Sequence, residues 1–533
     1  MGAIAARIVR QLQDAGVRTL FGVPGGGGNL DLMDAAREAG LPFVLTSTEN
    51  GAAIAAIAQA EITGQPGACL TTLGPGAASV LNGVACAHLD RVPLFVFTDS
   101  DASAARGAFT HQQLDQRALF AGVTRWGGRL SSDHADEVLA YAWTSVAGPP
   151  PGPVHIECSA DFETEPYPSA ILAVPAARPG ESPDVTELQG RLSGARKPLV
   201  IAGLGARRPD VAQAVRHVCE RRQVPAMVTY KAKGVIPDDH PRFAGVFTHG
   251  ALERPVVAES DLLIGIGLDP VELLPRRWDY AAPVVYVGAW PVPTGHVPFA
   301  SSHVTGDVAS VLAQIEAGLW WSDWDFDALH ARVEDGRRSV DIRSADAGLT
   351  PSEVVRTTAG RLSSEARVTV DAGAHMFPAT LLWPVREPNG WLISNGLSTM
   401  GFALPAAIGA ALLDRRRPVV ALTGDGGLLM CAGELQTLAR EQLRVIVVVF
   451  SDQSLSLIDI KQRQRGLAAN GLSLGATDWA GVARGFGLAA FAAADCAGLE
   501  RALEQAAATA GPVLIEARVD PSSYSATLKA VRG

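Results

Sequence analysis

Two aspartates in the last third of the chain stand where buried-looking strands end. Asp425 lies between glycines in Ala421–Gly427, ALTGDGG, directly after the apolar run of Pro418–Thr423. Asp452 follows a second apolar run, VIVVVF at Val445–Phe450, and comes 27 residues later (452 − 425 = 27). In a parallel sheet, one right-handed crossover returns the chain to the same edge. The two carboxylates are therefore expected side by side.

This pair suggests a metal site that also holds a phosphate. Glycines around Asp425 let backbone N–H groups approach an anion, and the N-terminus of the helix predicted over Leu428–Arg440 favours one as well. A carboxylate there would repel a phosphate unless a divalent cation lay between them, and Mg²⁺ takes oxygen ligands from both groups. We therefore predict Asp425, Asp452 and the main-chain carbonyl near Ser454 as metal ligands. For Gly-Asp-Gly-Gly alone, a tight turn is an equally good interpretation.

The stretch Gly424–Ile458 resembles the thiamine diphosphate motif, which runs Gly-Asp-Gly, helix, strand, Asn-Asn. The closing pair here is Ser451-Asp452, which keeps an oxygen ligand at the metal position but lacks the first asparagine. The resemblance implies thiamine diphosphate and Mg²⁺ as cofactors. The residues that it assigns to the diphosphate side are Gly424, Asp425, Gly426, Gly427, Asp452, Ser454 and Leu455.

The same resemblance implies a second carboxylate that hydrogen-bonds the pyrimidine ring of the cofactor and so activates it. Glu49 is the candidate, because it follows the strand predicted at Phe43–Ser47 and begins an Ala-rich helix with little charge nearby. An acid that only stabilises the helix N-terminus is the alternative interpretation. In the family, this glutamate and the diphosphate site come from different subunits. A homodimer or a dimer of dimers, with active sites at the subunit interface, is therefore implied.

Three further segments resemble cofactor contacts of the family. Gly74-Pro75-Gly76 resembles the loop on the pyrimidine side. Gly373-Ala374-His375 resembles a diphosphate-side loop that usually reads Gly-Gln-His, and it lacks the glutamine. Ser398–Phe402 places Met400 where a bulky residue supports the bent cofactor, with ordinary core filling as the alternative. The cofactor-binding candidates from these segments are Pro75, Gly373, His375, Ser398 and Met400.

A glycine-rich loop is the first candidate for the substrate side. Val23–Asn29, VPGGGGN, lacks the GK[ST] ending of a P-loop. By resemblance this turn borders the substrate, and its glycines imply room and mobility rather than a catalytic group. The substrate-loop candidates are Gly25, Gly26 and Gly27.

A second loop, Phe109–Asp115, FTHQQLD, resembles the Phe-Gln-Glu pattern of acetolactate-synthase-like relatives. Gln112 matches the glutamine that faces the substrate. His111 stands in place of an aromatic residue and could donate a proton or bind a carboxylate or hydroxyl. The alternative interpretation of His111 is a surface-loop histidine. Both residues are predicted as catalytic, together with Glu49.

The elements around these residues repeat one pattern: a short β-rich run, a Gly-containing loop and an Ala-rich helix. This pattern is typical of parallel sheets covered by helices. The strands predicted in the first third lie near Arg18–Val23, Phe43–Ser47, Ala68–Thr72, Leu94–Thr98 and Val154–Cys158. Those in the last third are Val368–Val370, Leu392–Ser394, Pro418–Leu422, Val445–Phe450 and Pro512–Ala517, and the central runs begin with KPLVIAGLGA, VPAMVTY, DLLIGIGL and PVVYVGA.

A chain of 533 residues is too long for one core. We predict an α/β protein with three doubly wound parallel-sheet domains, in the order found in thiamine diphosphate enzymes. They are a pyrimidine-binding domain at 1–165, a central Rossmann-like domain at 185–320 and a diphosphate-binding domain at 350–533. The proline-rich Pro166–Asp184 and the Trp-rich Trp320–Ala347 are interpreted as connections.

The central region offers the weakest chemical signal. Gly203-Leu204-Gly205 is a fragment of a dinucleotide-binding pattern, with Arg208 where the third glycine should fall. The stretch 244–252, AGVFTHGAL, lacks the Gly-Met-His-Gly run associated with flavin binding. FAD is therefore possible but not favoured. Gly267–Pro275, GLDPVELLP, has no predicted chemical role.

Composition excludes several classes of partner. The net charge of −10 is spread along the chain without a Lys/Arg run, so no nucleic acid is expected. The six scattered cysteines form no CxxC, which favours a reduced, cytoplasmic protein. The uncharged Trp391–Leu413 is long enough to cross a bilayer. Because it contains Ser394, Asn395 and Pro405, a buried strand–loop–helix is favoured, and no membrane partner is expected.

The whole chain resembles the group that contains acetolactate synthase and benzoylformate decarboxylase. The implied reaction removes CO₂ from a 2-oxo acid and then releases an aldehyde or joins the remaining group to a second carbonyl compound. One alternative is a lyase or hydrolase that cleaves a 2-hydroxyketone or diketone without loss of CO₂. The other is a non-catalytic member of the fold, against which the retained Glu49, Asp425 and Asp452 argue. In either enzymatic case, the partner is a small 2-oxo acid or ketone.

Overall fold

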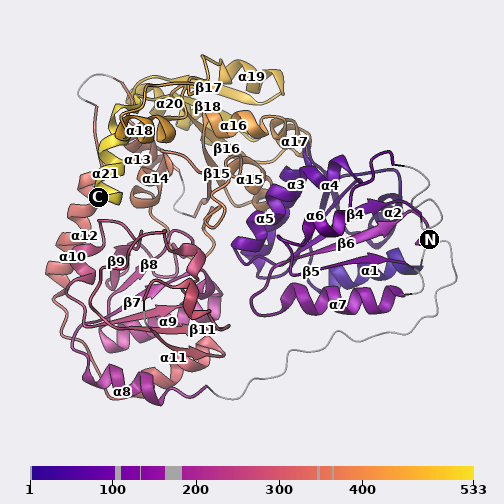
Figure 1. Cartoon of the computed structure of the whole chain (residues 1–533). Coiled ribbons are helices and arrows are strands. Elements are labelled where there is room, and N and C mark those ends of the chain that lie inside the picture. The colour runs from indigo at the N-terminus through magenta and orange to yellow at the C-terminus, as the bar shows by residue number, and fades with distance from the viewer. Residues whose placement is uncertain are drawn as a thin grey trace. The chain divides into compact units, whose positions relative to one another are not determined.

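The computed structural model describes residues 3–102, 110–131, 134–162, 183–299, 301–344, 348–362 and 365–533. Three six-stranded parallel sheets, each flanked by helices, make up the chain (Figure 1). The predicted fold class is confirmed. The predicted domain limits stay predictions, and the proline-rich connection lies almost entirely outside the described residues.

The N-terminal sheet has the strand order β2-β1-β3-β4-β6-β5. Its central strands are apolar and fully buried, which parallel strands covered on both faces require. The strands are β1 (Leu20–Val23), β2 (Phe43–Leu45), β3 (Gly67–Thr71), β4 (Leu94–Ser100), β5 (Trp126–Leu130) and β6 (Pro153–Ser159). The helices are α1 (Ala3–Asp14), α2 (Gly28–Ala39), α3 (Glu49–Thr63), α4 (Pro75–Ser79), α5 (Leu81–Leu89), α6 (Gln116–Phe120) and α7 (Ala135–Ala147).

The central sheet has the order β12-β11-β10-β7-β8-β9, so its strand order reverses between β10 and β7. The strands are β7 (Pro198–Ala202), β8 (Ala226–Val228), β9 (Phe243–Val246), β10 (Leu262–Ile266), β11 (Val284–Gly288) and β12 (Ser301–Thr305). The helices are α8 (Thr186–Gly194), α9 (Pro209–Arg222), α10 (Arg254–Val257), α11 (Val308–Ala317) and α12 (Phe326–Val340), with 3₁₀ turns at Leu204–Ala206, Pro270–Glu272 and Thr294–His296.

The C-terminal sheet has the order β14-β13-β15-β16-β18-β17, which is the order of the N-terminal sheet with 12 added to each strand number. The strands are β13 (Arg367–Val370), β14 (Trp391–Ile393), β15 (Val419–Gly424), β16 (Val445–Ser451), β17 (Ala489–Ala493) and β18 (Val513–Arg518). The helices are α13 (Pro351–Arg361), α14 (Met376–Leu382), α15 (Ala403–Leu413), α16 (Asp425–Cys431), α17 (Glu434–Glu441), α18 (Ser456–Gln464), α19 (Trp479–Gly485), α20 (Cys496–Ala508) and α21 (Tyr524–Arg532).

The described residues form two compact units that do not follow the chain in order. One contains the N-terminal sheet together with Gly396–Val419 and Leu429–Val445. The other contains the central sheet, the C-terminal sheet and Ile446–Gly533. Within the first unit, α15 lies against α3 so closely that a Cβ on Gly409 would collide with the carbonyl of Ala55. Two helices that belong by sequence to the last third, α15 and α17, therefore pack with the first third.

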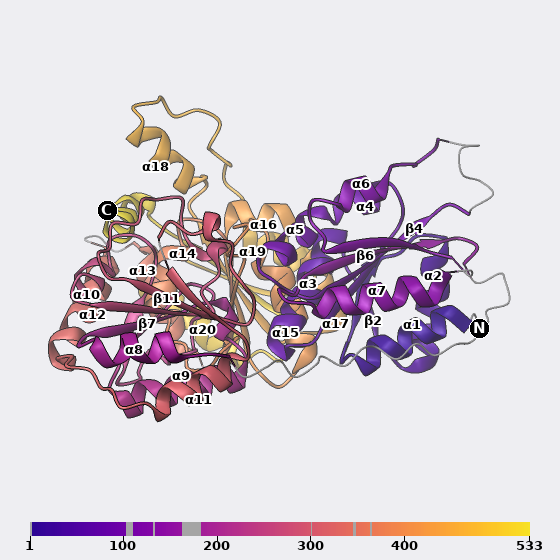
Figure 2. The same ribbon diagram turned by 60° about the horizontal axis from the view of Figure 1, so that its bottom comes forward.

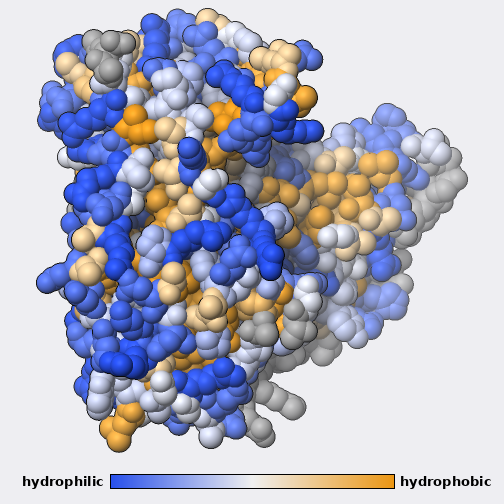
Figure 3. Space-filling view, turned by 60° about the vertical axis from the view of Figure 1, so that its left-hand side comes forward, coloured by the Kyte–Doolittle hydropathy of each residue, from blue (hydrophilic) through white to orange (hydrophobic). Residues whose placement is uncertain are grey.

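Two expectations about single elements have different outcomes. The uncharged stretch Trp391–Leu413 is strand β14, a loop and helix α15, as predicted. Within the described ranges, no helix combines the length and the apolarity needed to cross a bilayer. On the face in Figure 3, hydrophilic and hydrophobic residues are interspersed. The single helix predicted over Leu428–Arg440 is wrong, because the chain breaks at Ala432-Gly433 and forms α16 and α17 instead.

Candidate functional site

The two aspartates meet at one edge of the C-terminal sheet, where β15 and β16 are neighbours. One carboxylate oxygen of Asp425, Oδ2, accepts the backbone N–H groups of Asp452 at 3.2 Å and Gln453 at 2.6 Å. The crossover therefore returns the chain as the spacing predicted. Asp452 in turn accepts the backbone N–H of Ser454 at 3.0 Å and the hydroxyl of Ser456 at 2.7 Å.

Both carboxylates are held in a setting that disfavours their charge. Burial raises the pKa of Asp425, and burial together with the charge of Asp425 raises the pKa of Asp452 to about 6. A divalent cation between them would relieve this repulsion. Among the described residues, no group of three or more His, Cys, Asp or Glu is arranged to hold a metal. Two carboxylates completed by backbone, phosphate and water oxygens are a donor set that fits Mg²⁺.

Gly427, two residues after Asp425, is required by a carboxylate that the sequence analysis did not select. A Cβ on Gly427 would collide with Oδ2 of Asp371, which is fully buried and accepts the hydroxyl of Thr423 at 2.7 Å. Asp371 follows strand β13 directly, just as Asp425 follows β15. The strand-end position that drew attention to Asp425 is thus the signal that could have identified Asp371.

His375 lies next to this loop and is also buried. Its ring stacks on Phe450 with centroids 5.0 Å apart, and a Cβ on Gly424 would come within 3.3 Å of it. Burial lowers the pKa of His375 to about 4, so the ring is neutral at pH 7. Its Nε2 has no hydrogen-bond partner among the described residues. A buried, unpartnered ring nitrogen beside the Gly-Asp-Gly-Gly turn fits a polar group bound there, and the adjoining Gly373 packs against the same ring.

The activating-acid candidate lies in the other compact unit, at the N-terminus of α3. Thr48 is the N-cap of this helix, and its hydroxyl accepts the backbone N–H of Gly51 at 2.9 Å. Glu49, the first helical residue, is half-buried, and its Oε1 would be 3.3 Å from a Cβ placed on Gly76. Glu49 and the Gly74-Pro75-Gly76 loop therefore meet, as the resemblance implied. Thr48 rather than Glu49 is the N-cap, but Glu49 lies in the first turn, where an acid stabilises the helix N-terminus, so both interpretations of Glu49 stay open.

The segment around Met400 is tied to the same region. Asn82 in α5 donates to the hydroxyl of Thr399 at 2.8 Å and to the side chain of Asn50 at 3.3 Å. Ser398 is exposed, with a positive φ of 51°. Met400 is only partly buried, so filling a closed core does not account for it.

The glycine-rich loop is more constrained than the sequence analysis expected. Asp99, fully buried at the end of β4, accepts the backbone N–H groups of Asn29 at 2.7 Å and Gly27 at 3.3 Å. A Cβ on Gly25 would collide with the Asp99 carboxylate, whereas a Cβ on Gly26 would meet nothing within 4 Å. The expectation of room is therefore wrong for Gly25 and Gly27 and holds for Gly26, whereas the mobility of the loop stays a prediction. Asp99 is a second strand-end acid that the sequence analysis passed over.

The two predicted residues of the second substrate loop are exposed. Gln112 has a positive φ of 58°, and its carbonyl oxygen would be 2.5 Å from a Cβ on Gly74. This places Gln112 against the predicted pyrimidine-side loop. His111 is exposed beside Gln112. Phe109, which begins the loop, lies outside the described residues.

In the central domain, side chains of the protein itself occupy the place where a dinucleotide would be expected to bind. Dinucleotide crevices lie beyond the strand ends where the order reverses, here between β10 and β7. Glu272 lies there and accepts the backbone N–H of Leu204 at 2.9 Å, the backbone N–H of Asp269 at 3.1 Å and the hydroxyl of Thr229 at 2.5 Å. A Cβ on Gly205 would also be 3.0 Å from the backbone of Gly267. The stretch Gly267–Pro275, which had no predicted role, supplies this filling.

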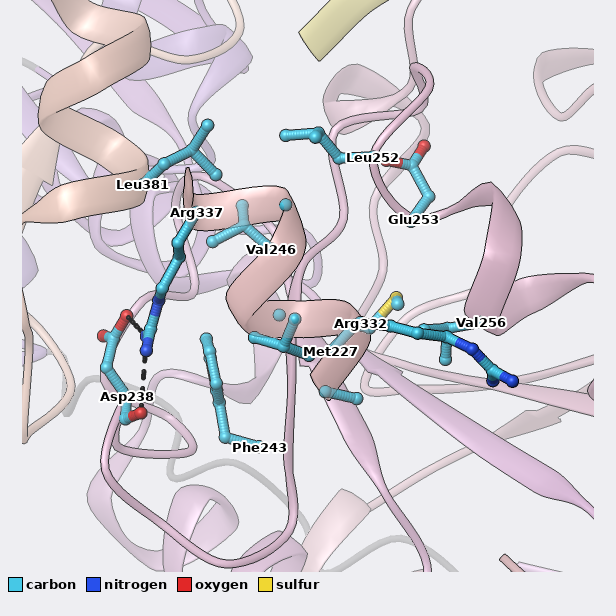
Figure 4. A pocket seen from close by; sticks show the side chains of 14 residues that line it. Met227, Asp238, Phe243, Val246, Leu252, Glu253, Val256, Arg332, Arg337 and Leu381 are labelled. Carbon is cyan, nitrogen blue, oxygen red and sulfur yellow. Dashed lines mark hydrogen bonds and ion pairs between the residues drawn. The ribbon is translucent and has the colours of Figure 1, made fainter. Parts of the chain in front are cut away.

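A cavity of about 40 Å³ lies elsewhere in the central domain, beside β8, β9 and α12 (Figure 4). Arg337 points to Asp238, whose carboxylate it meets at 3.2 Å, and the buried Lys233 holds the same carboxylate at 2.9 Å. This volume suits water rather than a cofactor. None of the predicted site residues lines it.

The segment after Asp452 leads into a projecting helix. Ser454 forms an antiparallel bridge with Ser473, and the backbone N–H of Leu455 donates to Leu472 at 3.0 Å before α18 begins. Figure 2 shows α18 and the following loop extending from the rest of their unit. The predicted ligand positions at 452–455 therefore lie directly before α18.

Comparisons with known proteins agree with this arrangement. Three models of thiamine pyrophosphate enzymes match the chain: the N-terminal TPP binding domain at residues 3–119, the central domain at 185–315 and the C-terminal TPP binding domain at 371–517. The catabolic acetolactate synthase of Raoultella terrigena is 30% identical over 96% of this chain and 94% of its own length.

Two further relatives show how wide the similarity is. A probable 2-ketoarginine decarboxylase of Pseudomonas aeruginosa is 31% identical over 96% of this chain and 93% of its own length. The acetolactate synthase of Bacillus subtilis is 27% identical over 97% of this chain and 93% of its own length. The relative named as an acetolactate synthase and the relative named as a 2-ketoarginine decarboxylase are thus about equally similar to this chain.

Proposed function

The chain belongs to the thiamine pyrophosphate enzyme family, and on that premise we propose how its residues act. It is a thiamine-diphosphate-dependent enzyme of the group that decarboxylates or ligates 2-oxo acids. The observation that carries the residue assignments is the meeting of Asp425 and Asp452 beside Gly427, where an added Cβ would collide with Asp371. A non-catalytic member of the fold would need neither feature.

On the diphosphate side, Asp425 and Asp452 hold Mg²⁺, with the carbonyl near Ser454 as a further ligand. The donor set is oxygen only, which Mg²⁺ prefers. Gly424, Gly426 and Gly427 give the phosphates access to backbone N–H groups, and the buried Asp371 keeps the turn in place through Thr423. His375 presents a neutral ring to the same turn. Leu455 and Gly373 border this site.

On the pyrimidine side, the carboxyl group of Glu49 would hydrogen-bond the pyrimidine ring of the cofactor, and Pro75 and Met400 would shape its surroundings. When bound, thiamine diphosphate supplies the carbon nucleophile and the electron sink for loss of CO₂. Gln112 and Gly26 border the substrate. The carbonyl oxygen of Gln112 lies against Gly74, and Gly26 faces open space. His111 is the candidate for binding the substrate carboxylate or for donating a proton.

The substrate is a 2-oxo acid, and the similarity does not decide the fate of the group left after CO₂ is lost. Relatives named for ligation and for decarboxylation differ by one percentage point in identity to this chain. Product analysis with pyruvate and longer 2-oxo acids separates an acyloin product from an aldehyde. Acyloins and cyclic diketones offered as substrates test cleavage without loss of CO₂.

FAD is not part of the proposal. The crevice that would receive a dinucleotide in the central domain contains the Glu272 carboxylate, which takes the backbone N–H group of Leu204. A diphosphate would have to displace this buried carboxyl group and its hydrogen bonds. Addition of FAD to the purified protein is expected to give no bound flavin absorbance after gel filtration.

The oligomeric state and the cellular location complete the proposal. The enzyme acts as a homodimer or a dimer of dimers, with Glu49 of one subunit serving the diphosphate site of another. It acts in the cytoplasm, where its six cysteines, which form no disulfide in the described part of the chain, would stay reduced.

Calorimetric titration of metal-stripped protein with thiamine diphosphate, with and without Mg²⁺, tests the site. We expect tight binding only with Mg²⁺, and loss of that binding in Asp425→Ala. The variant Glu49→Gln should bind the cofactor as the parent does but lose at least about 100-fold in turnover. Binding that ignores Mg²⁺ would refute the metal assignment, and full activity of Glu49→Gln would refute the activating acid.

A further inference from the structure

Helix α17 carries a glutamate, Glu434, whose side chain binds the turn that precedes Glu49. Glu434 is fully buried. Its carboxylate accepts the backbone N–H of Ser47 at 3.2 Å, and the backbone N–H and hydroxyl of Thr48 at 3.0 and 3.1 Å. A fourth donor, the hydroxyl of Thr437, lies on its own helix at 2.8 Å. Every partner is neutral, and two of them are backbone groups at the N-terminus of α3.

The chain is built to admit this carboxylate. A Cβ on Gly51 would collide with Oε1 of Glu434, so the first turn of α3 needs a glycine there. The break between α16 and α17 at Gly433 brings the helix start against Ser47, whose hydroxyl donates to the carbonyl of Gly433 at 2.6 Å. Arg440, farther along α17, donates to the carbonyl of Leu45. The contact therefore spans the whole segment from β2 to α3 (Figure 1).

Opposing effects act on the buried Glu434 carboxyl group. Burial is the larger effect and raises its pKa above the ordinary value, whereas the four donors act in the opposite direction. The carboxyl group also lies at the N-termini of two helices, α3 and its own α17, where the aligned peptide dipoles stabilise negative charge. Through these hydrogen bonds, Glu434 anchors the start of α3.

From these contacts we propose that Glu434 is a positioning residue for Glu49: it fixes Ser47 and Thr48, and through them the first residue of α3. The proposal rests on the role of Glu49 under Proposed function and adds a residue that does not touch the cofactor. A carboxyl group that must meet one ring nitrogen is sensitive to displacements of about 1 Å. A side chain that holds Ser47 and Thr48 in place is therefore expected to affect activation of the cofactor rather than its affinity.

Two variants disturb this contact from opposite sides. Glu434→Ala removes the carboxylate, and Gly51→Ala keeps it but fills its place with a methyl group. Glu441→Ala is the matched control, because it removes a glutamate from the same helix that forms ion pairs with Arg415 and Arg440 and, within the described part of the chain, no hydrogen bond with Ser47 or Thr48. In the protein without cofactor, amide hydrogen exchange of the peptide around Ser47 and Thr48 should accelerate in both variants but not in the control.

In the protein loaded with thiamine diphosphate and Mg²⁺, the readout is exchange of the thiazolium C2 proton with D₂O, followed by acid quench and proton NMR. This readout requires no substrate. We expect exchange at least about ten-fold slower in Glu434→Ala and Gly51→Ala, with cofactor affinity unchanged. If Glu434→Ala does not fold, Gly51→Ala carries the test alone, since alanine is favoured inside a helix.

A double-mutant comparison separates positioning from a general structural role. If Glu434 acts through Glu49, adding Glu434→Ala to Glu49→Gln should slow C2 exchange no further. A further loss in the double variant, or parental exchange in both Glu434→Ala and Gly51→Ala, would overturn the proposal. Parental exchange in Glu49→Gln itself would instead show that the assignment of the activating acid is wrong. The two failures are thus distinguishable.

Discussion

Glu272 is a carboxyl group enclosed by neutral donors in the central domain, and its titration should be visible in the stability of the protein. Burial raises its pKa to about 7, although hydrogen bonds from Thr229, Leu204 and Asp269 act in the opposite direction. The folded state therefore binds this proton more tightly than the unfolded chain does. The resulting stabilisation is complete below about pH 4.5 and is lost as the pH rises to about 7.

We predict that Glu272→Gln removes this dependence. The glutamine oxygen can accept the N–H groups of Leu204 and Asp269, and its NH₂ can donate to the Thr229 hydroxyl, so no buried group loses its partner. The parent should lose up to about 3 kcal/mol of unfolding free energy between pH 5 and 8 relative to the variant. Urea unfolding at several pH values, followed by tryptophan fluorescence, measures the difference. Parallel pH profiles of parent and variant would contradict the raised pKa.

At this scale, the sequence predicted the strand-end acids that belong to a known motif and missed those that do not. Asp425 and Asp452 meet as their spacing required. Asp371 and Asp99 also end strands, yet neither lies in a recognisable motif, because their roles depend on a neighbouring loop that is distant in sequence. Glu434 is still harder to predict, since its partners lie 386 and 387 residues away. No local pattern encodes such a contact.

At the scale of elements, helices α3 and α15 approach each other with no room for an added methyl group. A Cβ on Gly409 would collide with the carbonyl of Ala55, and Gln59 donates to the carbonyl of Gly409 at 3.1 Å. Small residues on both helices make this spacing possible, since α3 is rich in alanine. The interface therefore depends on the glycine more than on any large side chain.

We predict that Gly409→Ala lowers the unfolding free energy by about 1–3 kcal/mol, because overpacking outweighs the gain in helix propensity. The matched control is Gly360→Ala in α13, where a Cβ would meet nothing within 4 Å. That variant should be neutral or more stable by up to about 1 kcal/mol. Thermal unfolding of both variants beside the parent gives the comparison. Equal midpoints for the two alanine variants would mean that the helices can separate without cost.

The strands that the sequence analysis missed share a position in their sheets. They are β5, β9, β12 and β17, and each stands at an end of its sheet's strand order. An edge strand has a partner on one side only, so its residues are less uniformly buried and need not be β-branched. Their sequences, WGGRL, FAGV, SSHVT and AAFAA, contain glycine, alanine or polar residues where central strands have valine and isoleucine. Central strands were predicted because their burial on both faces produces long apolar runs.

At the scale of the whole molecule, the N- and C-terminal sheets have the same strand order, yet each contributes a different half of the proposed chemistry. Glu49 belongs to one compact unit, and Asp425 and Asp452 to the other. The sequence analysis predicted three α/β domains from the repeated strand–loop–helix pattern. It did not predict that α15 and α17 join the first unit, since that depends on packing between distant segments.

If each active site combines Glu49 of one subunit with Asp425 of another, two inactive variants should complement each other. Glu49→Gln has the diphosphate site intact, and Asp425→Ala has the activating acid intact. A hybrid dimer of the two then contains one site with both residues and one with neither. Co-expression with two affinity tags isolates the hybrid, and C2-proton exchange of bound thiamine diphosphate reports on it without a substrate. Fast exchange should appear in the hybrid and in neither parent variant. If both residues of a site came from one chain, the hybrid would contain no complete site, and exchange would stay slow.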